Sequence, residues 1–509
     1  MDTSYEAYCL ADPLFYDSPA NATASGGDFF PALRSVPAGW EVGHRDTWVM
    51  FRPPGCSLPA QGWKVHVSAC LDEAEAVASL VRDYCLRAGL AVKFLRNRAA
   101  FIAANSKYAP RGSSGKLATI YPCDADELHS VLVGLDRLLA GRRGPYVLSD
   151  LRWEDGPLYV RYGGFAERYV PTDDGELVAA IESPTGELVP DRRTPTFRPP
   201  QWAPLPPFLA PQLANRNRQT VADLPFQVDT ALHFSNGGGV YLGTHLATGR
   251  PVVVKEARPH AGLDQHGTDA VCRLLRERAM LEELAGVPGV PAVIDHAVCA
   301  GHHFLVQEQV PGRPLIQVLA TRHPLIRAEP TPAEVADFRT WALAVADGVG
   351  RALQGIHERG VVFGDLHPGN VMVGPDGEVH LVDFELASFV GERLRPGLGA
   401  AGYAAPQDRS GLDIDRYAFA CLRLALFLPL TALQPLDATM AERLAAAAVE
   451  RFGLPAAFAA SIMDTLGGSG SAGPAVPAPA APIPAAPTTA DTERNLAVMK
   501  YPFRHMRQS

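Results

Sequence analysis

The sequence predicts a multidomain α+β protein, in which an N-terminal domain of mixed helices and strands precedes a bilobal second domain. Three observations predict this class. The chain has 509 residues, of which 47% are hydrophobic and 20% charged, which suits several hydrophobic cores. Two proline-rich stretches, 195–211 and 467–490, interrupt it. Between them, strand-like segments come first and helix-like segments second, which is typical of two lobes.

The proline-rich stretches divide the chain into five parts. We expect a first domain over 1–205, a connector over 206–214, a second domain over 215–466, a flexible Ala/Pro-rich linker over 467–490 and a tail over 491–509. The tail has mixed charge, which fits either a disordered end or a short docking segment.

Composition excludes several classes of protein. The formal net charge of −9 argues against general nucleic-acid binding, which needs a surplus of Lys and Arg. The first ten residues lack the basic start and apolar core of a signal peptide. The longest apolar stretch, Tyr417–Leu433, contains Arg423 and Pro429, and predicts a buried helix instead of a membrane span. Eight cysteines without a Cys-x-x-Cys pair suggest neither a disulfide framework nor a zinc site. We therefore expect a cytoplasmic enzyme without nucleic-acid or membrane partners.

In the first domain, strand and helix patterns alternate. Trp63–Ala69 alternates apolar and polar residues like a half-buried strand, and Asp72–Ala88 has the spacing of an amphipathic helix. Further strands are predicted at Leu90–Leu95, Lys116–Tyr121 and Leu158–Tyr162.

In the second domain, strands give way to helices. Strands are predicted at Phe226–Phe234, Gly239–His245, Pro251–Ala257 and Phe304–Val310, and a helix at Asp269–Leu284. Helices dominate after Thr331, and Val335–Arg359 is the longest of them.

The start of the second domain carries a pattern suited to binding nucleotide phosphates. A glycine-rich turn between two predicted strands lets backbone N–H groups approach phosphates closely. Lys255, in the next strand, can hold the phosphates, and Glu277 in the following helix is placed to pair with it. The predicted nucleotide-binding residues are Gly237, Gly238, Gly239, Val240, Lys255, Glu277 and Glu308.

Two later motifs suit phosphoryl transfer. In Phe363-Gly-Asp-Leu-His-Pro-Gly-Asn370, Asp365 would orient an acceptor hydroxyl and Asn370 would hold Mg²⁺. In His380-Leu-Val-Asp-Phe-Glu385, Asp383 would link Mg²⁺ to the phosphates. The expected cofactors are therefore Mg²⁺ and a nucleoside triphosphate, either ATP or GTP.

Together these motifs resemble the eukaryotic-type protein kinase fold over 215–466. The sequence departs from that pattern at four places. It has Phe-Gly-Asp for His-Arg-Asp, Asp-Phe-Glu for Asp-Phe-Gly, Ala-Pro-Gln for Ala-Pro-Glu, and Gly-Gly-Gly for the strictly spaced glycine pattern. Because the usual arginine is absent, we expect little control by activation-loop phosphorylation. The same motifs also resemble aminoglycoside and choline kinases, so a small-molecule phosphotransferase is one alternative. A pseudokinase scaffold that binds a phosphopeptide is another.

Basic residues gather at strand positions of the first domain. Lys64 and His66 alternate on one strand, and Lys93 lies in the next predicted strand. Further polar residues that could join them are Arg111, Lys116, Tyr121, Arg152 and Arg161. Such a cationic cleft could bind a phosphate group or expel it by β-elimination, which needs a base, an acid and cations for the phosphate. A lysine base must be neutral, and neighbouring cations lower its pKa.

Residues 1–205 resemble the lyase domain of class III lanthipeptide synthetases, which is similar to bacterial phosphothreonine lyases. The matching stretches are Trp63-Lys-Val-His66, Lys93-Phe-Leu95, Asn105-Ser-Lys107, Arg111, Gly115-Lys116, Tyr121-Pro122 and Arg161-Tyr-Gly-Gly-Phe165. The resemblance implies Lys93 as general base and His66 as general acid. It also implies that Lys64, Arg111 and Arg161 bind phosphate, with Tyr121, Lys116 and Arg152 in support.

The resemblance implies a bifunctional dehydratase. The kinase would phosphorylate Ser and Thr of a precursor peptide that carries a leader, and the lyase would eliminate the phosphate to give dehydroalanine or dehydrobutyrine. That family normally carries a LanC-like cyclase domain after the kinase. We expect it to be missing here, by truncation or because a separate cyclase is a partner.

Overall fold

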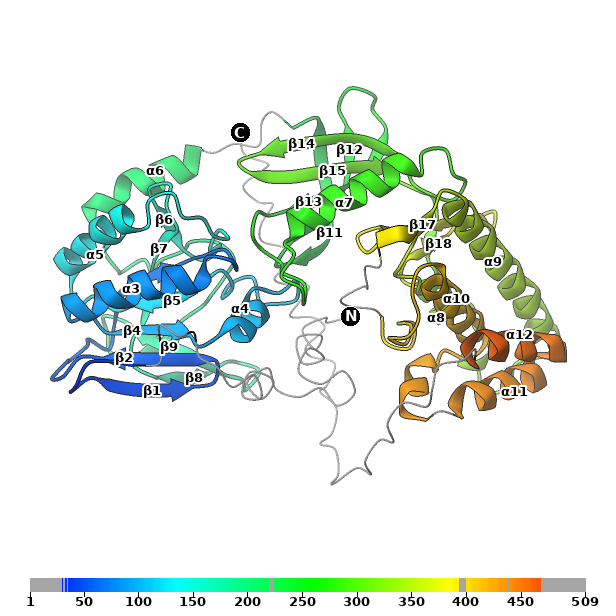
Figure 1. The fold of residues 1–509 in the computed structure, drawn as a ribbon, viewed down its shortest axis with the longest axis horizontal. Coiled ribbons are helices and arrows are strands. Elements are labelled where there is room, and N and C mark those ends of the chain that lie inside the picture. The colour runs from blue at the N-terminus through cyan, green and yellow to red at the C-terminus, as the bar shows by residue number, and fades with distance from the viewer. Residues whose placement is uncertain are drawn as a thin grey trace.

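A computed structural model describes residues 30, 33, 35–218, 224–392, 400–437 and 439–467. The N-terminal domain lies at the left of Figure 1, and the two lobes of the second domain lie at its centre and right. Both domains mix helices and strands, and the predicted fold class is confirmed. Residues 468–490 of the predicted linker and the whole predicted tail, 491–509, lie outside the described residues.

The N-terminal domain is built on a seven-stranded antiparallel sheet. In spatial order its strands are β1 (Glu41–Arg45), β2 (Trp48–Arg52), β4 (Val92–Leu95), β5 (Ala118–Ile120), β3 (Gln61–Val67), β7 (Leu158–Gly164) and β6 (Leu151–Trp153). The helices are α3 (Ala74–Ala88), α4 (Arg98–Asn105) and α5 (Ala125–Leu138). Helices α3 and α5 contact each other and the sheet.

Alternation along the strands gives this sheet an apolar face and a polar face. Val65, Phe94 and Ile120 are fully buried in the hydrophobic core that includes apolar residues of α3 and α5. The residues between them, such as His66 and Lys93, face the other side. The helices therefore cover one face and leave the polar face for a site.

The predicted connector is helical and belongs to the N-terminal domain. After a small sheet of β8 (Tyr169–Pro171), β9 (Leu177–Glu182) and β10 (Leu188–Pro190) come the 3-10 helix η2 (Pro207–Leu209) and α6 (Ala210–Arg218). Leu209 is fully buried in the N-terminal core, and Gln212 donates to Glu154 at 2.7 Å. Proline is tolerated in the first turn of a helix, so a proline-rich segment could still fold as one.

The small lobe of the second domain is a five-stranded antiparallel sheet with one helix. Its strands, in spatial order, are β11 (Phe226–Ser235), β12 (Gly238–His245), β13 (Pro251–Ala257), β15 (His302–Glu308) and β14 (Val293–Cys299). Helix α7 (Ala270–Glu283) packs against this sheet (Figure 1). The side chain of Asp269 caps its N-terminus by accepting from the backbone N–H of Cys272.

The large lobe is mainly helical. Its helices are α8 (Leu315–Arg322), α9 (Pro332–Glu358), α10 (Leu412–Phe427), α11 (Met440–Phe452) and α12 (Ala456–Gly467), with 3-10 helices η3 (Pro324–Ile326), η4 (Val390–Glu392) and η5 (Thr431–Leu436). Its short strands are β16 (Arg313–Pro314), β17 (Val361–Val362), β18 (Val371–Val373), β19 (Val379–Leu381) and β20 (Ser388–Phe389). A capping box of Thr331 and Glu334 begins α9. The predicted apolar helix ends at Phe427, and in the described part of the chain no helix is long and apolar enough to cross a membrane.

Candidate active sites

The first candidate site lies on the polar face of the N-terminal sheet. Strand register places Lys64 opposite Arg161, and His66 opposite Thr119, which in turn lies opposite Lys93. Residues paired across strands point to the same side of a sheet, so these side chains share one face. Lys64, His66 and Arg161 are each less than a tenth exposed. The sequence-predicted base, acid and two phosphate-binding residues are thus brought together.

His66 is held by a carboxylate that the sequence analysis missed. Asp150 is fully buried and forms a hydrogen bond with His66 Nδ1. Its other oxygen accepts from Ser149 Oγ at 2.7 Å and lies 3.8 Å from Lys116 Nζ. Burial lowers the pKa of His66 to about 3, so the imidazole is neutral and its proton faces Asp150. A phosphate dianion beside Nε2 would favour the protonated ring.

The lysines of this face are buried cations close to one another. Burial, with Arg193 and Lys116 nearby, lowers the pKa of Lys93 to about 8. Burial lowers the pKa of Lys116 to about 8 as well, and that of Lys64 falls well below its usual range. Lys93 Nζ lies 4.4 Å from the centroid of the Trp48 ring. A lysine with such a pKa is neutral often enough to act as a base near neutral pH.

Two further charged residues complete the cluster. Asp191 pairs with the Arg161 guanidinium, whose direction it fixes. Arg193 lowers the pKa of Lys93 by its charge, and its carbonyl oxygen lies so close to Gly112 that a Cβ there would be 2.0 Å away. Both follow β10 in an Asp-Arg-Arg run that carries no local motif, so the sequence analysis did not select them.

Not all predicted residues join the cluster. Tyr121 does, because Lys64 Nζ lies 6.0 Å from the centroid of its ring. The Arg152 guanidinium instead donates to the carbonyl oxygens of the turn at 155–156. Arg111 stacks over Phe234 of the second domain, 4.6 Å from the ring centroid. Phosphate binding by these two arginines stays a prediction.

The second candidate site lies between the lobes of the kinase-like domain. Lys255 Nζ lies 2.6 Å from Glu277 Oε1 and 2.7 Å from Asp383 Oδ1. Burial opposes charge on Lys255, but Asp383 and Glu277 raise its pKa above the usual value. The backbone N–H of Phe384 also donates to Glu277, at 3.2 Å. The predicted lysine, its helix partner and the metal-binding aspartate therefore meet.

The loop Phe363–Asn370, which contains Asp365, is anchored by a buried carboxylate. Asp415 accepts from the backbone N–H groups of Phe363 and Gly364, at 2.7 and 2.8 Å. Asn370 Nδ2 donates to the Asp365 side chain at 3.1 Å. Burial and the charge of Asp383 raise the pKa of Asp365 to about 7, which suits a general base.

The residues present fit a magnesium ion bound with a nucleotide. Asp383 offers carboxylate oxygens, and Asn370 offers its amide oxygen because its nitrogen faces Asp365. Among the described residues no group of three or more His, Cys, Asp or Glu could hold a metal. Magnesium does not require such a group, since it is commonly bound by one or two protein ligands together with substrate phosphates and water.

The glycine-rich turn packs closely on its surroundings. A Cβ on Gly238 would lie 1.9 Å from the carbonyl oxygen of Glu256, and one on Gly237 would lie 2.9 Å from Ala270 Cβ. A Cβ on Gly239 would lie 2.4 Å from the Tyr241 hydroxyl oxygen, and Val240 lies opposite Lys255. Glu308 ends β15, where its exposed side chain accepts from the N–H of Ala292 at 3.2 Å. Nucleotide contacts of these residues stay predictions.

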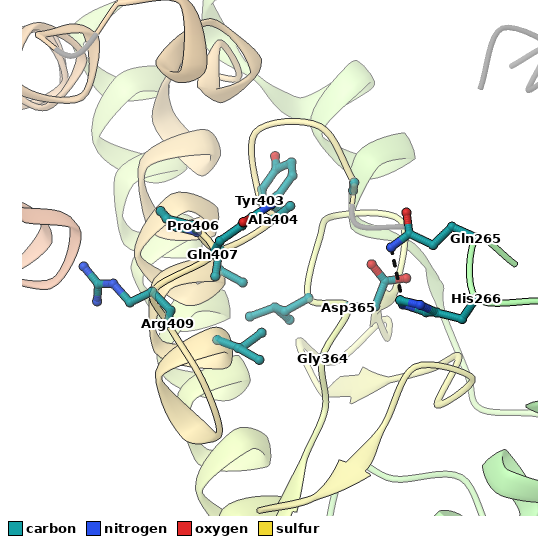
Figure 2. Close-up of a pocket in the computed structure, with 14 residues that line it drawn as sticks. Gln265, His266, Gly364, Asp365, Tyr403, Ala404, Pro406, Gln407 and Arg409 are labelled. Atoms are coloured by element: carbon teal, nitrogen blue, oxygen red, sulfur yellow. Dashed lines mark hydrogen bonds between the residues drawn. The ribbon is translucent and has the colours of Figure 1, made fainter. Parts of the chain in front are cut away.

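A pocket of about 320 Å³ opens beside Asp365 (Figure 2). Tyr403, Ala404 and Pro406 line one side of it, and Gln265 and His266 of the small lobe line the other. The Asp365 carboxylate is part of the lining of this pocket.

Comparisons with known proteins match this arrangement. Residues 28–219 match the RamC N-terminal domain, and residues 232–445 match the protein kinase domain. The chain is 49% identical over 462 residues to a probable SapB synthase of Streptomyces coelicolor, an alignment that covers 90% of this chain and 50% of that protein. The chain therefore spans about half the length of this relative.

The kinase part also has relatives of its own. It is 27% identical over 216 residues to the serine/threonine-protein kinase pkn2 of Myxococcus xanthus, covering 40% of this chain and 24% of that protein. It is 30% identical over 185 residues to PknA of Mycobacterium tuberculosis, a match that covers 35% of this chain and 39% of the kinase. These matches agree with the lobes and motifs described above.

Proposed function

Because this chain belongs with the proteins that join a RamC N-terminal domain to a protein kinase domain, we propose that it is a bifunctional dehydratase, as in class III lanthipeptide synthetases. The kinase phosphorylates Ser and Thr of a precursor peptide with ATP or GTP. The N-terminal domain then eliminates the phosphate and leaves dehydroalanine or dehydrobutyrine. A leader segment on the peptide and a separate cyclase are proposed partners.

Phosphorylation uses the residues between the lobes. Asp365 accepts the proton of the substrate hydroxyl as its oxygen bonds to the γ-phosphorus and the bond to the nucleoside diphosphate breaks. Lys255 binds phosphate oxygens, and Glu277 positions it. Asn370 and Asp383 would hold Mg²⁺, which supplies positive charge to the phosphates when bound.

Elimination uses the polar face of the N-terminal sheet. Neutral Lys93 takes the α-proton of the phosphorylated residue, a Cα–Cβ double bond forms, and the bond between Cβ and the phosphate oxygen breaks. His66 gives a proton to that oxygen, and Asp150 stabilises the imidazolium that precedes this step. Lys64, Lys116 and Arg161 hold the phosphate. The products are the alkene and inorganic phosphate.

The observation that carries this proposal is the buried cation cluster on the polar sheet face. Positive side chains outnumber carboxylates there. Three of the cations and both carboxylates are less than a tenth exposed, namely Lys64, Lys116, Arg161, Asp150 and Asp191. Gathering like charges in a low-dielectric site is costly, so such a cluster indicates a bound anion. A phosphorylated residue from the neighbouring kinase site supplies that anion.

Intact mass of a Ser- and Cys-rich precursor peptide tests the proposal. With the full chain, Mg²⁺ and ATP or GTP, the expected change is −18 Da for each modified Ser or Thr. With Lys93→Ala, the expected product instead gains about 80 Da for each phosphate, because phosphorylation continues without elimination. A wild-type product that keeps its phosphate would refute the lyase step. Modification of an aminoglycoside and not of any peptide would refute the peptide substrate.

A further inference from the structure

We propose that the N-terminal domain supplies a residue to the phosphotransfer site, namely Lys107, whose ammonium binds the phosphoryl group in transfer. This proposal rests on the proposed kinase function. Lys107 lies two residues after α4, in the loop that leads to β5. Its Nζ is 2.6 Å from Glu385 Oε2, 278 residues further along the chain. Together with Asp365 and Asp383, these two residues line a cavity of about 50 Å³.

The backbone around Lys107 is fixed on both sides by the kinase-like domain. Lys107 donates its N–H to the carbonyl of Leu263 at 3.1 Å and accepts from the N–H of Asn236 at 3.0 Å. The Asn236 side chain is 1% exposed and donates to the carbonyls of Asn105 and Ser106 at 3.1 and 3.0 Å. Asn236 belongs to the glycine-rich turn, so these hydrogen bonds fix the position of Lys107 relative to that turn. Its position is therefore set before any ligand arrives.

Of the cations Lys107 and Arg273 that line this cavity, Lys107 is the one that is available to bind a phosphate group. Among the described residues that line this cavity, the cations are Lys107 and Arg273. The Arg273 guanidinium is engaged by Glu385 and by the carbonyls of Thr268 and Gly262. The Lys107 side chain donates to Glu385 and is more than a quarter exposed. A phosphate dianion can therefore replace Glu385 as the partner of Lys107, while Glu385 stays paired with Arg273.

This arrangement also gives Glu385 a role. Glu385 stands where protein kinases carry the glycine of Asp-Phe-Gly. Its carboxylate bridges Lys107 of one domain and Arg273 of the other. It thereby holds the lysine next to Asp383 until the nucleotide binds. A cation placed where charge develops on the transferred phosphoryl group accelerates transfer.

The test compares the full-length chain with Lys107→Met and Lys107→Arg, each combined with Lys93→Ala so that phosphopeptide accumulates. We expect Lys107→Met to lower kcat for phosphorylation on the order of 100-fold, while KM for the nucleotide changes less than about threefold. Lys107→Arg should recover part of the rate because it restores the charge. Arg87→Met, at the exposed end of α3, removes a charge far from this cavity and should change neither value.

A second measurement separates catalysis from domain packing. Lys107→Met with Lys93 intact should eliminate phosphate from a synthetic phosphoserine peptide at the wild-type rate. A kcat for phosphorylation within threefold of the control would overturn the proposal. Parallel loss of both activities with a lower thermal midpoint would also overturn it, because Lys107 would then be a structural interface residue. If no variant with Lys107 present phosphorylates any peptide, the proposed function itself fails, together with this inference.

Discussion

Asp150→Asn is the sharpest test of the elimination site, because it removes one charge and keeps the shape. Asp150 is fully buried, and its two oxygens meet His66 Nδ1 and Ser149 Oγ. During elimination His66 must carry a positive charge, which burial disfavours and Asp150 stabilises. Two unit charges about 4 Å apart interact by about 4 kcal/mol at an effective dielectric constant near 20.

The imidazolium charge is spread over the ring, so we take about 3 kcal/mol of this stabilisation as lost. Since about 1.4 kcal/mol corresponds to a tenfold change in rate, elimination should slow on the order of 100-fold. The assay is single-turnover elimination from a synthetic phosphoserine peptide, followed by mass. Phosphorylation by the same variant serves as the folding control and should be unchanged. Elimination within threefold of wild type across pH 6.5–9 would refute the role of the His66–Asp150 pair.

Three further predictions address both sites. The elimination rate should follow a bell-shaped pH profile. It should rise toward pH 8 because Lys93 must be neutral to accept a proton and its pKa is about 8, and it should fall at higher pH because His66 must be protonated; a pH–rate profile of the same single-turnover reaction checks this. Asp383→Asn should lower phosphorylation at least about 100-fold, because it removes a proposed metal ligand and a Lys255 partner, yet leave elimination from a synthetic phosphopeptide unchanged. Gly112→Ala should cost about 1–3 kcal/mol of folding free energy in a denaturant titration and slow elimination, because its Cβ would displace the Arg193 backbone.

The kinase-like site could be predicted almost residue by residue. Phosphoryl transfer needs a lysine, a helix carboxylate, a base and metal ligands in a fixed order along the chain, and that order is readable without a structure. The sequence therefore identified Lys255, Glu277, Asp365 and Asp383, and the structure brings these four together. The strands and helices of this domain also agree with the predicted ranges to within a few residues, as Pro251–Ala257 shows.

The N-terminal site could be predicted only in part. Lys64, His66 and Lys93 lie on strands, where alternation reveals a shared face. Asp150 and Arg193 lie outside strands. Tertiary folding brings them to the site, and no repeating pattern in the nearby sequence predicts their position. The connector between the domains stays a prediction. Its prolines indicate a break in the pattern, and within it the structure has a 3-10 helix at Pro207–Leu209 with Leu209 fully buried.

One loop now connects the chemistry of the two domains. Asn105 Oδ1 accepts from the N–H of Gly115 at 2.9 Å, which closes the loop between α4 and β5. The same loop carries Lys107 into the kinase-like site and Lys116 into the proposed elimination site beside Asp150. A change at one site that moves this loop should therefore also move the lysine at the other site, because the two lysines lie on the same hydrogen-bonded loop. It follows that a kinase domain without the N-terminal domain would retain Asp365 and Asp383 but lose one of the cations beside them.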